Sequence, residues 1–211
     1  MNHLFLNDHQ LKSEFHVLAG IDEAGRGPLA GPVVVAAVIL KEGFEHPLIR
    51  DSKKISESVR DALFSEIIEN SICHQIEVIP PAIIDEMNIL QATLMGMRVC
   101  AEKLAVQPDL CLIDGNRLPI RMPYPSRTVI KGDDAHACIA AASILAKVTR
   151  DRIMIELDAQ YPGYGFAKHK GYPTREHLEA IEKLGVLDIH RKSYGPVAQL
   201  TFNFNKSIDF H

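Results

Sequence analysis

The chain has 211 residues, of which 46% are hydrophobic and 24% charged, so its length and composition are those of a globular protein with one main core. Its net charge of −4 excludes a basic surface over the whole molecule, so any contact with a nucleic acid must be local. Residues 1–16 lack the apolar stretch of a secretory signal, and the longest apolar run, at 33–40, is too short to span a bilayer. Four cysteines lie far apart without a C-x-x-C pair, which indicates reduced thiols and a cytoplasmic protein.

The hydrophobic pattern predicts an α/β order of elements. In chain order we expect strands at 17–22 and 33–40, a helix at 56–70, a strand at 73–79, a helix face running from 89 to 104, strands at 110–113 and 127–131, and a long Ala-rich helix at 135–157. Beyond Tyr161 the chain becomes rich in Gly, Pro, basic and aromatic residues, and Thr174 opens another helix. We therefore predict a sheet domain over 1–160 with a C-terminal extension over 161–211, together forming one compact unit.

The most informative segment is residues 20–31, Gly-Ile-Asp-Glu-Ala-Gly-Arg-Gly-Pro-Leu-Ala-Gly. Two adjacent acids end an apolar stretch, and a turn rich in Gly and Pro carries Arg26. Hard cations such as Mg²⁺ and Mn²⁺ bind carboxylate oxygens, while glycines let backbone N–H groups approach a phosphate or a ribose. A dinucleotide-binding turn fits poorly, because the glycines are spaced G-x-G-x-x-x-G around Pro28 and a β-branched run follows where a helix would be needed.

Further acids stand at the ends of other predicted strands. Asp114 follows the strand at 110–113, and Asp133 comes shortly after the strand at 127–131. Taken singly, each acid is as well explained as a solvated carboxylate or a helix cap. Together with Asp22 and Glu23 they can converge at one edge of an α/β sheet, where a divalent cation would relieve their repulsion. Neighbours in a regular strand point to opposite faces, so the pair at 22–23 requires the strand to end there, as Gly25 suggests.

Several longer blocks resemble the type 2 ribonuclease H family, and within it bacterial ribonuclease HII. They follow in family order from about residue 17 to residue 197, at 20–28, 51–54, 85–90, 112–116, 131–133, 141–151 and 164–174. The resemblance implies an α/β protein with a ribonuclease H-like fold, in which a mixed five-stranded sheet is flanked by helices and followed by a helical C-terminal extension.

The resemblance also implies an activity. Members of the family hydrolyse the RNA strand of RNA–DNA hybrids and cut 5′ of ribonucleotides embedded in duplex DNA, leaving 3′-hydroxyl and 5′-phosphate ends. Carried over residue by residue, the catalytic and metal-binding acids are Asp22, Glu23, Asp114 and Asp133, with Mn²⁺ or Mg²⁺ as the cofactor. Asp134 is an adjacent alternative, and Asp133 is preferred because it directly follows Lys-Gly.

A ribonucleotide differs from a deoxyribonucleotide only by its 2′-hydroxyl, so selectivity must depend on that group. Gly25, Arg26 and Gly27 resemble the family segment whose backbone reads this hydroxyl. Tyr172 matches the family tyrosine that packs on sugar and base at the RNA–DNA junction. Tyr164 is the competing aromatic residue, and either ring could instead be a packing residue.

Three lysines are predicted to meet the substrate backbone. Lys53 belongs to the Asp-Ser-Lys-Lys block, although a lysine pair is more often a solvated surface. Lys168 and Lys170 flank His169 among aromatic residues, which is typical of a local nucleic-acid contact on a chain of negative net charge. Arg150 on the long helix could serve in an interior ion pair or contact a phosphate, and the sequence does not decide.

Two other interpretations were weighed. Ribonuclease HIII shares the acidic residues, but its members typically carry Lys in place of Arg26 and an additional N-terminal domain. A catalytically silent hybrid-binding module would gain affinity by losing the acids, which are all present. The expected partners are therefore RNA–DNA hybrids and duplex DNA containing ribonucleotides, with no membrane, and nothing in the sequence requires more than a monomer.

Overall fold

The computed structural model describes residues 2–50 and 52–200, with the side chain of Lys53 excepted. The chain divides into two compact units: residues 1–24, 34–78 and 93–148 form the first, and residues 25–33, 79–92 and 149–211 form the second. The division predicted at residue 160 stays a prediction.

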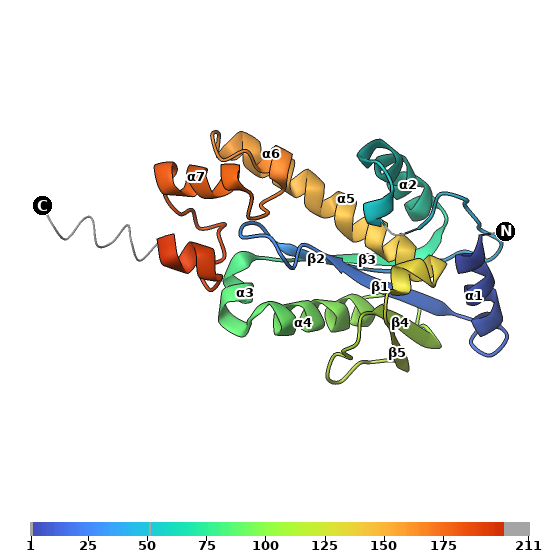
Figure 1. Ribbon diagram of the computed structural model, residues 1–211. Helices are drawn as coiled ribbons and strands as arrows, with labels where there is room; N and C mark the ends of the chain where they lie inside the picture. The colour runs from blue at the N-terminus through green and yellow to red at the C-terminus, as the bar shows by residue number, and fades with distance from the viewer. Residues whose placement is uncertain (1, 51, 201–211) are drawn as a thin grey trace, which may run out of the picture. The chain divides into compact units, whose positions relative to one another are not determined.

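A mixed five-stranded sheet lies at the centre of the first unit, in the order β3-β2-β1-β4-β5 (Figure 1). Its strands are β1 (Leu18–Ala24), β2 (Val33–Leu40), β3 (Ser71–Ile79), β4 (Leu110–Asp114) and β5 (Ser126–Val129). β1 runs antiparallel to β2 and parallel to β4, and β4 runs parallel to β5. The predicted α/β class and mixed five-stranded sheet are confirmed.

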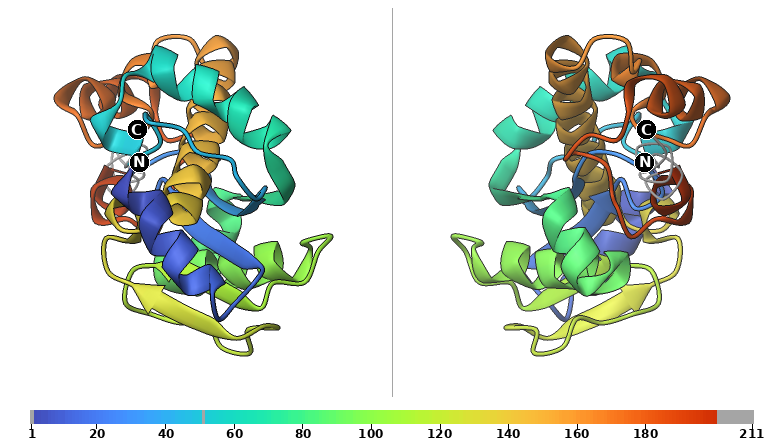
Figure 2. Two further views of the ribbon diagram at one scale, coloured as in Figure 1. Left: turned by 90° about the vertical axis from the view of Figure 1, so that its right-hand side faces the viewer. Right: turned by 90° about the vertical axis from the view of Figure 1, so that its left-hand side faces the viewer.

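Seven helices and two 3₁₀ turns lie wholly within the described residues, and residues 195–200 are also helical. They are α1 (His3–Lys12), η1 (Ser52–Lys54), α2 (Glu57–Glu69), α3 (Pro81–Met87), α4 (Ile89–Glu102), η2 (Gly132–Asp134), α5 (Ala137–Gln160), α6 (Phe166–His169) and α7 (Arg175–Leu184). Within the first unit, α4 and the beginning of α5 lie on opposite faces of the sheet (Figures 1 and 2). The sequence analysis did not predict α1, because its apolar residues form no regular stripe. Asn2 caps this helix: its side chain accepts a hydrogen bond from the Leu4 N–H at 3.2 Å.

The face of β1 that meets α5 requires a glycine. A Cβ atom at Gly20 would lie 2.1 Å from the backbone carbonyl carbon of Cys138, far inside van der Waals contact. Around this approach, buried apolar residues from β1, β4 and α5 form a continuous cluster: Leu18, Leu110, Leu112, Cys138 and Ile139. The start of α5 therefore packs directly on the two strands that carry the predicted acids.

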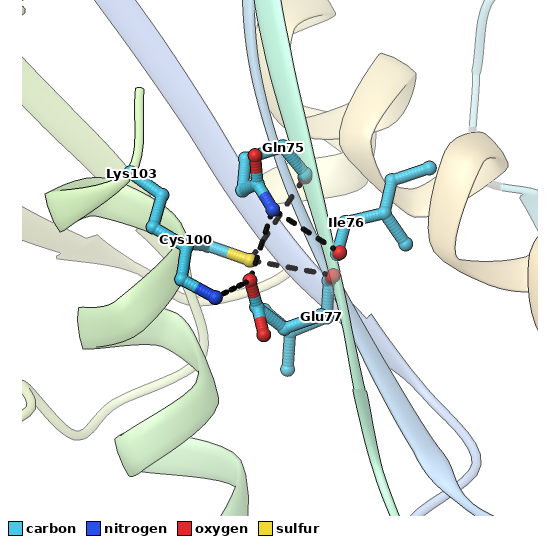
Figure 3. Close-up of polar contacts among 6 residues, drawn as sticks. Gln75, Ile76, Glu77, Cys100 and Lys103 are labelled. Atoms are coloured by element: carbon cyan, nitrogen blue, oxygen red, sulfur yellow. Dashed lines mark hydrogen bonds and ion pairs between the residues drawn. The ribbon is translucent and has the colours of Figure 1, made fainter. Parts of the chain in front are cut away.

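The opposite face is fastened to α4 through β3 (Figure 3). The buried Cys100 thiol donates to the Val35 carbonyl at 3.4 Å, and the Lys103 ammonium pairs with the Glu77 carboxylate at 2.7 Å. The Gln75 side-chain amide donates to the same carboxylate at 2.9 Å. A buried thiol and a partly exposed ion pair thus hold the end of α4 against β2 and β3.

All four cysteines are free thiols, and we expect them to differ sharply in reactivity. Burial raises the pKa of Cys100 and of Cys111 to about 12, and burial and the nearby Asp8 raise that of Cys138 well above its usual value. Because the thiolate is the reactive form, only the half-buried Cys73 should be alkylated promptly in the native protein at pH 8. Mass mapping of alkylated peptides checks this, and prompt labelling of Cys100 without denaturant would contradict it.

The second unit has its own apolar core. It combines residues from the glycine-rich loop at 25–31, from α5, α6 and α7, and from the segments that flank α6 and follow α7. These residues are Leu29, Ala30, Met154, Tyr164, Phe166, Ala180, Ile181 and Val197. The helix that the sequence predicts after Thr174 is α7, and the Thr174 hydroxyl caps it by accepting from the His177 N–H at 3.2 Å. The glycine-rich loop is therefore packed into a folded core.

Candidate active site

Parallel pairing brings two of the predicted acids to the same end of neighbouring strands. Ile21 of β1 stands opposite Ile113 of β4, so Asp22 and Asp114 are the next residues on the two strands. The Gly132 N–H donates to Asp114 Oδ1 at 2.7 Å, which places η2 and its buried Asp133 beside β4. The sheet topology thus brings together two acids, Asp22 and Asp114, that are 92 positions apart in the chain.

The prediction that the first strand ends at Asp22 and Glu23 is wrong about where the strand stops. β1 continues to Ala24, because Glu23 and Ala24 still pair with Val35 and Val34 of β2. Only the pairing with β4 stops at Ile21. The Asp22 carboxylate instead turns along its own strand and accepts from the Glu23 N–H at 2.7 Å. The two neighbouring acids therefore interact although the strand does not end between them.

Asp22 has the most strongly perturbed environment of these acids. Its residue is only 4% exposed. Burial, with added repulsion from Glu23 and Asp114, raises the pKa of the Asp22 carboxyl well above its usual value. Hydrogen bonds from the Glu23 N–H and the Ser143 hydroxyl oppose the shift. An ionised Asp22 is thus disfavoured as long as no positive charge balances it.

The donor set fits a hard divalent cation by its chemistry. It consists of carboxylate oxygens, the ligands that Mg²⁺ and Mn²⁺ prefer, and a cation would offset the repulsion that raises the Asp22 pKa. Over residues 2–50 and 52–200, no group of three or more His, Cys, Asp or Glu side chains is arranged so that it could hold a metal ion as it stands.

The choice between Asp133 and its neighbour Asp134 is supported by their contacts. The Lys54 ammonium donates to both carboxylate oxygens of Asp134, at 2.5 and 2.6 Å, whereas Asp133 is buried beside Asp114. Asp134 is thus already charge-balanced and exposed. Lys53 was predicted to contact the substrate backbone. Its side chain lies outside the part of the chain that the structure describes.

In the second unit, the structure brings the glycine segment and Tyr172 together. A Cβ atom at Gly27 would lie 3.5 Å from Cε1 of Tyr172, and the Leu29 N–H donates to the Gly171 carbonyl at 2.8 Å. Gly25 has φ +97°, and a Cβ there would lie 2.1 Å from Arg150 Nε. Only glycine satisfies both constraints at position 25, and the exposed Arg26 and Gly27 follow it.

The two candidate tyrosines have different surroundings. Tyr164 is 5% exposed, stacks on Phe166 with 5.3 Å between ring centroids, and donates its hydroxyl to the Gly185 carbonyl at 2.7 Å. Tyr172 is 43% exposed. Tyr164 is thus a core residue, which favours Tyr172 as the ring available to a ligand.

The basic segment around α6 is less uniform than its sequence suggests. The Lys168 ammonium pairs with Glu176 at 2.6 Å but is largely exposed, and the Lys170 ammonium donates to the Ala167 carbonyl at 2.6 Å. His169 is buried, so it lies outside any surface patch. The two lysines remain candidates for contacts with a substrate backbone.

Sequence reasoning missed the role that two buried arginines play in the second unit. Arg150 and Arg191 are both almost fully buried, and their guanidinium groups donate to carbonyls of the glycine-rich loop. Arg150 thus donates to the Pro32 and Ala30 carbonyls, a role that the sequence analysis did not consider for it. Nothing in the sequence separates these arginines from exposed ones, because their acceptors are backbone carbonyls of no particular residue type.

Three buried histidines surround Phe166: His169, His177 and His190. The Nδ1 atom of His169 accepts from the Gly171 N–H at 3.1 Å, so its Nε2 carries the proton that is donated to the Tyr164 carbonyl at 2.8 Å. Both ring nitrogens are satisfied in the neutral form.

The same reasoning fixes the other two rings. His190 Nδ1 accepts from the Leu187 N–H at 2.9 Å, so its Nε2–H donates to His177 Nε2 at 3.2 Å. His177 Nδ1–H then donates to the Tyr172 carbonyl at 3.0 Å. A further proton on either ring would leave two N–H donors facing each other. The network that ends at the Tyr172 carbonyl is thus fully satisfied while both histidines are neutral.

This network predicts a loss of stability in mild acid. Burial lowers the pKa of His177 and of His190 to about 4, from an ordinary value near 6.5. Below the ordinary pKa the unfolded chain binds protons that the folded chain does not, so the free energy of unfolding should fall by about 2 kcal/mol per histidine between pH 7 and pH 5. Urea titrations at both pH values measure it.

The matched variants are His190→Gln, which removes one of the buried rings, and His9→Gln, which removes an exposed one. The first should reduce the pH dependence by about half, and by more than the second does. An equal pH dependence in all three proteins would show that the acid sensitivity arises elsewhere.

Comparisons with known proteins agree with this arrangement. The sequence model of the family described as ribonuclease HII matches residues 19–197. Ribonuclease HII of Mycoplasma capricolum is 51% identical over 196 residues, which cover 92% of this chain and 95% of that protein. Ribonuclease HII of Vibrio vulnificus is 55% identical over 183 residues, covering 87% of this chain and 88% of that protein.

A solved structure supports the fold. The crystal structure of ribonuclease H2 from Pyrococcus horikoshii superposes with a TM-score of 0.76 at 27% identity, covering 90% of this chain and 99% of that one.

Proposed function

This chain belongs to the ribonuclease HII family, and we therefore propose a specific reaction for it. Proteins of this family are nucleases, and membership supports endonuclease activity on RNA–DNA hybrids. In the proposed reaction, this chain cuts the phosphodiester 5′ of a ribonucleotide embedded in duplex DNA as well as within hybrids, leaving 3′-hydroxyl and 5′-phosphate ends. The observation that carries this proposal is the buried Asp22 with Glu23 and Asp114 beside it at the end of two parallel strands.

The acids supply negative charge in a place where it is unfavourable without a partner. Asp22, Glu23, Asp114 and Asp133 would hold two divalent ions, Mn²⁺ or Mg²⁺. When bound, such ions activate water and neutralise charge on a phosphodiester in an in-line displacement. The hydrogen bonds from the Glu23 N–H to Asp22 and from the Gly132 N–H to Asp114 orient one oxygen of each carboxylate.

Recognition of the ribose is assigned to the second unit. Gly27 lies next to the exposed Tyr172, so a backbone that can approach a 2′-hydroxyl stands beside a ring that can pack on a sugar. Only Ala24 separates Glu23 of β1 from Gly25 in the chain. Lys168 and Lys170 would add contacts to the nucleic-acid backbone, which strengthen binding without sequence preference.

The proposal includes a cytoplasmic, monomeric enzyme that starts the removal of ribonucleotides from DNA. Three buried reduced thiols agree with a reducing compartment. No helix in the described part of the chain is long and apolar enough to cross a membrane.

Cleavage of three end-labelled duplexes tests the reaction. One is DNA with a single ribonucleotide, one is an RNA–DNA hybrid, and one is all DNA, each incubated with Mn²⁺, Mg²⁺ or a chelator. We expect metal-dependent cuts in the first two, with a single product end 5′ of the ribonucleotide in the first. Cleavage of the hybrid alone would overturn the assigned ribose reading, and binding without any cleavage would favour a silent hybrid-binding module.

A further inference from the structure

Arg191 is buried within the second unit, and its guanidinium group is directed at the glycine-rich loop. Nη2 donates to the carbonyls of Gly25 at 2.6 Å and Gly31 at 3.0 Å, and Nε donates to Gly31 at 3.1 Å. Nη1 donates to the Arg26 carbonyl at 2.9 Å and to the Tyr194 hydroxyl at 3.0 Å. One planar group thus fixes carbonyls at both ends of the loop.

Two other side chains complete this arrangement. The Tyr194 hydroxyl donates to the Arg26 carbonyl at 2.6 Å, and its ring lies 5.2 Å from the Arg191 guanidinium carbon. Arg150 donates to the carbonyls of Pro32 at 3.0 Å and Ala30 at 3.1 Å. Carbonyls of the loop therefore accept from two buried guanidinium groups and from the hydroxyl of the half-buried Tyr194.

Peptide planarity gives these contacts a consequence for the opposite side of the loop. In a trans peptide the C=O and the next N–H point in opposite directions. Because the carbonyls of Gly25 and Arg26 point at Arg191, the N–H groups of Arg26 and Gly27 point away from it. These are the backbone donors of the segment assigned to ribose reading, on exposed residues beside Tyr172.

The backbone around Arg191 is itself anchored. Asp85 accepts from the N–H groups of Lys192 and Ser193, both at 2.9 Å, and from the Ser193 hydroxyl at 2.5 Å. The Arg191 N–H donates to the Leu29 carbonyl at 2.8 Å. The backbone that carries Arg191 is therefore held in place, and this limits the positions that its guanidinium group can take.

We propose that Arg191 is a positioning residue for substrate specificity: by holding the carbonyls of Gly25 and Arg26, it directs the backbone N–H groups that distinguish ribose from deoxyribose. The proposal rests on the proposed function of this loop. It predicts that a change at Arg191 weakens the preference for a ribonucleotide more than the general affinity for duplex DNA.

The substitution Arg191→Lys tests the geometry while it keeps the charge. A lysine ammonium cannot present planar, parallel donors to carbonyls at both ends of the loop. The kinetic measurement uses a duplex with one ribonucleotide as substrate with Mn²⁺, and the identical all-DNA duplex as a competitive inhibitor. The ratio of the inhibitor's Ki to the substrate's KM then reports the preference for the ribonucleotide.

We expect Arg191→Lys to lower this ratio about tenfold, chiefly through a higher KM, with Ki changed little. A purely structural role would reduce the active fraction, and hence the apparent kcat, without moving the ratio. The matched control is Arg175→Lys, at an exposed arginine of α7 that pairs with Glu179, and its ratio should equal that of the unmodified protein.

Tyr194→Phe provides a second test if the lysine variant does not fold. It removes the hydroxyl that donates to the Arg26 carbonyl and accepts from Arg191, while it keeps the ring. We expect a smaller fall of the same ratio, and an unchanged ratio in the folded variants would overturn the proposal. If the unmodified protein cuts the substrate but shows no preference over all-DNA duplex, or does not cut it, the proposed function fails instead.

Discussion

Replacing Asp22 with asparagine is expected to lower turnover by at least about a thousandfold while the folded protein becomes no less stable. The carboxylate is buried, with Glu23 and Asp114 adding repulsion, so its ionised form is disfavoured in the folded state. Its raised pKa means that its contribution to stability is lost as pH rises above the ordinary value of an aspartate. Asparagine has no charge to bury, and its side-chain oxygen can still accept from the Glu23 N–H.

Initial rates on a duplex with one ribonucleotide, together with thermal unfolding at pH 7.5, measure both effects. Asp134→Asn is the matched control, because that neighbouring acid is exposed and paired with Lys54. The control should keep activity within a few fold. A large loss of stability in Asp22→Asn would mean that the carboxylate serves the fold, and full activity would remove Asp22 from the proposed site.

Gly20→Ala is expected to cost at least about 4 kcal/mol of folding free energy, a large part of the roughly 5–15 kcal/mol that stabilises a typical domain. The added Cβ would lie 2.1 Å from the Cys138 carbonyl carbon and 2.2 Å from its oxygen. These are backbone atoms within α5, so no side-chain rotation relieves the overlap. β1 and α5 would have to separate, and the cluster around Leu18 and Ile139 would lose its packing.

Chemical denaturation followed by circular dichroism measures this effect. Gly195→Ala is the control, because a Cβ there meets no atom within 4 Å. That substitution should leave stability unchanged or raise it slightly. A cooperative transition of normal midpoint in Gly20→Ala would show that the contact between β1 and α5 adjusts more easily than its geometry indicates.

The sequence predicted most of the sheet because burial leaves a plain signature in it. β2 is apolar throughout since both of its faces are covered, and β1 and β4 are short apolar runs. The prediction failed for α1, whose apolar residues form no regular stripe. It also ended β1 too early, because the pairing partner that extends β1 to Ala24 is β2, and strand pairing is a tertiary property.

The candidate acids were predicted from their positions after apolar runs and from the family blocks around them. The sequence could not show how their environments differ. Asp22 is buried and accepts from its neighbour's N–H, whereas Asp134 is balanced by Lys54, although both are aspartates beside another acid. These differences depend on which distant segment covers each carboxylate.

By itself, the amino-acid sequence determined the α/β class, the family and the residue types of the site, because periodicity and motif spacing are local properties of the chain. Only the tertiary structure decided that the carbonyls of Gly25 and Arg26 face a buried Arg191, and that Tyr164 is covered while Tyr172 is exposed. Arg191 lies 160 to 166 positions along the chain from the loop carbonyls it holds, and its acceptors are backbone oxygens that every residue carries. Such a contact leaves no pattern in the sequence, since only folding brings its partners together.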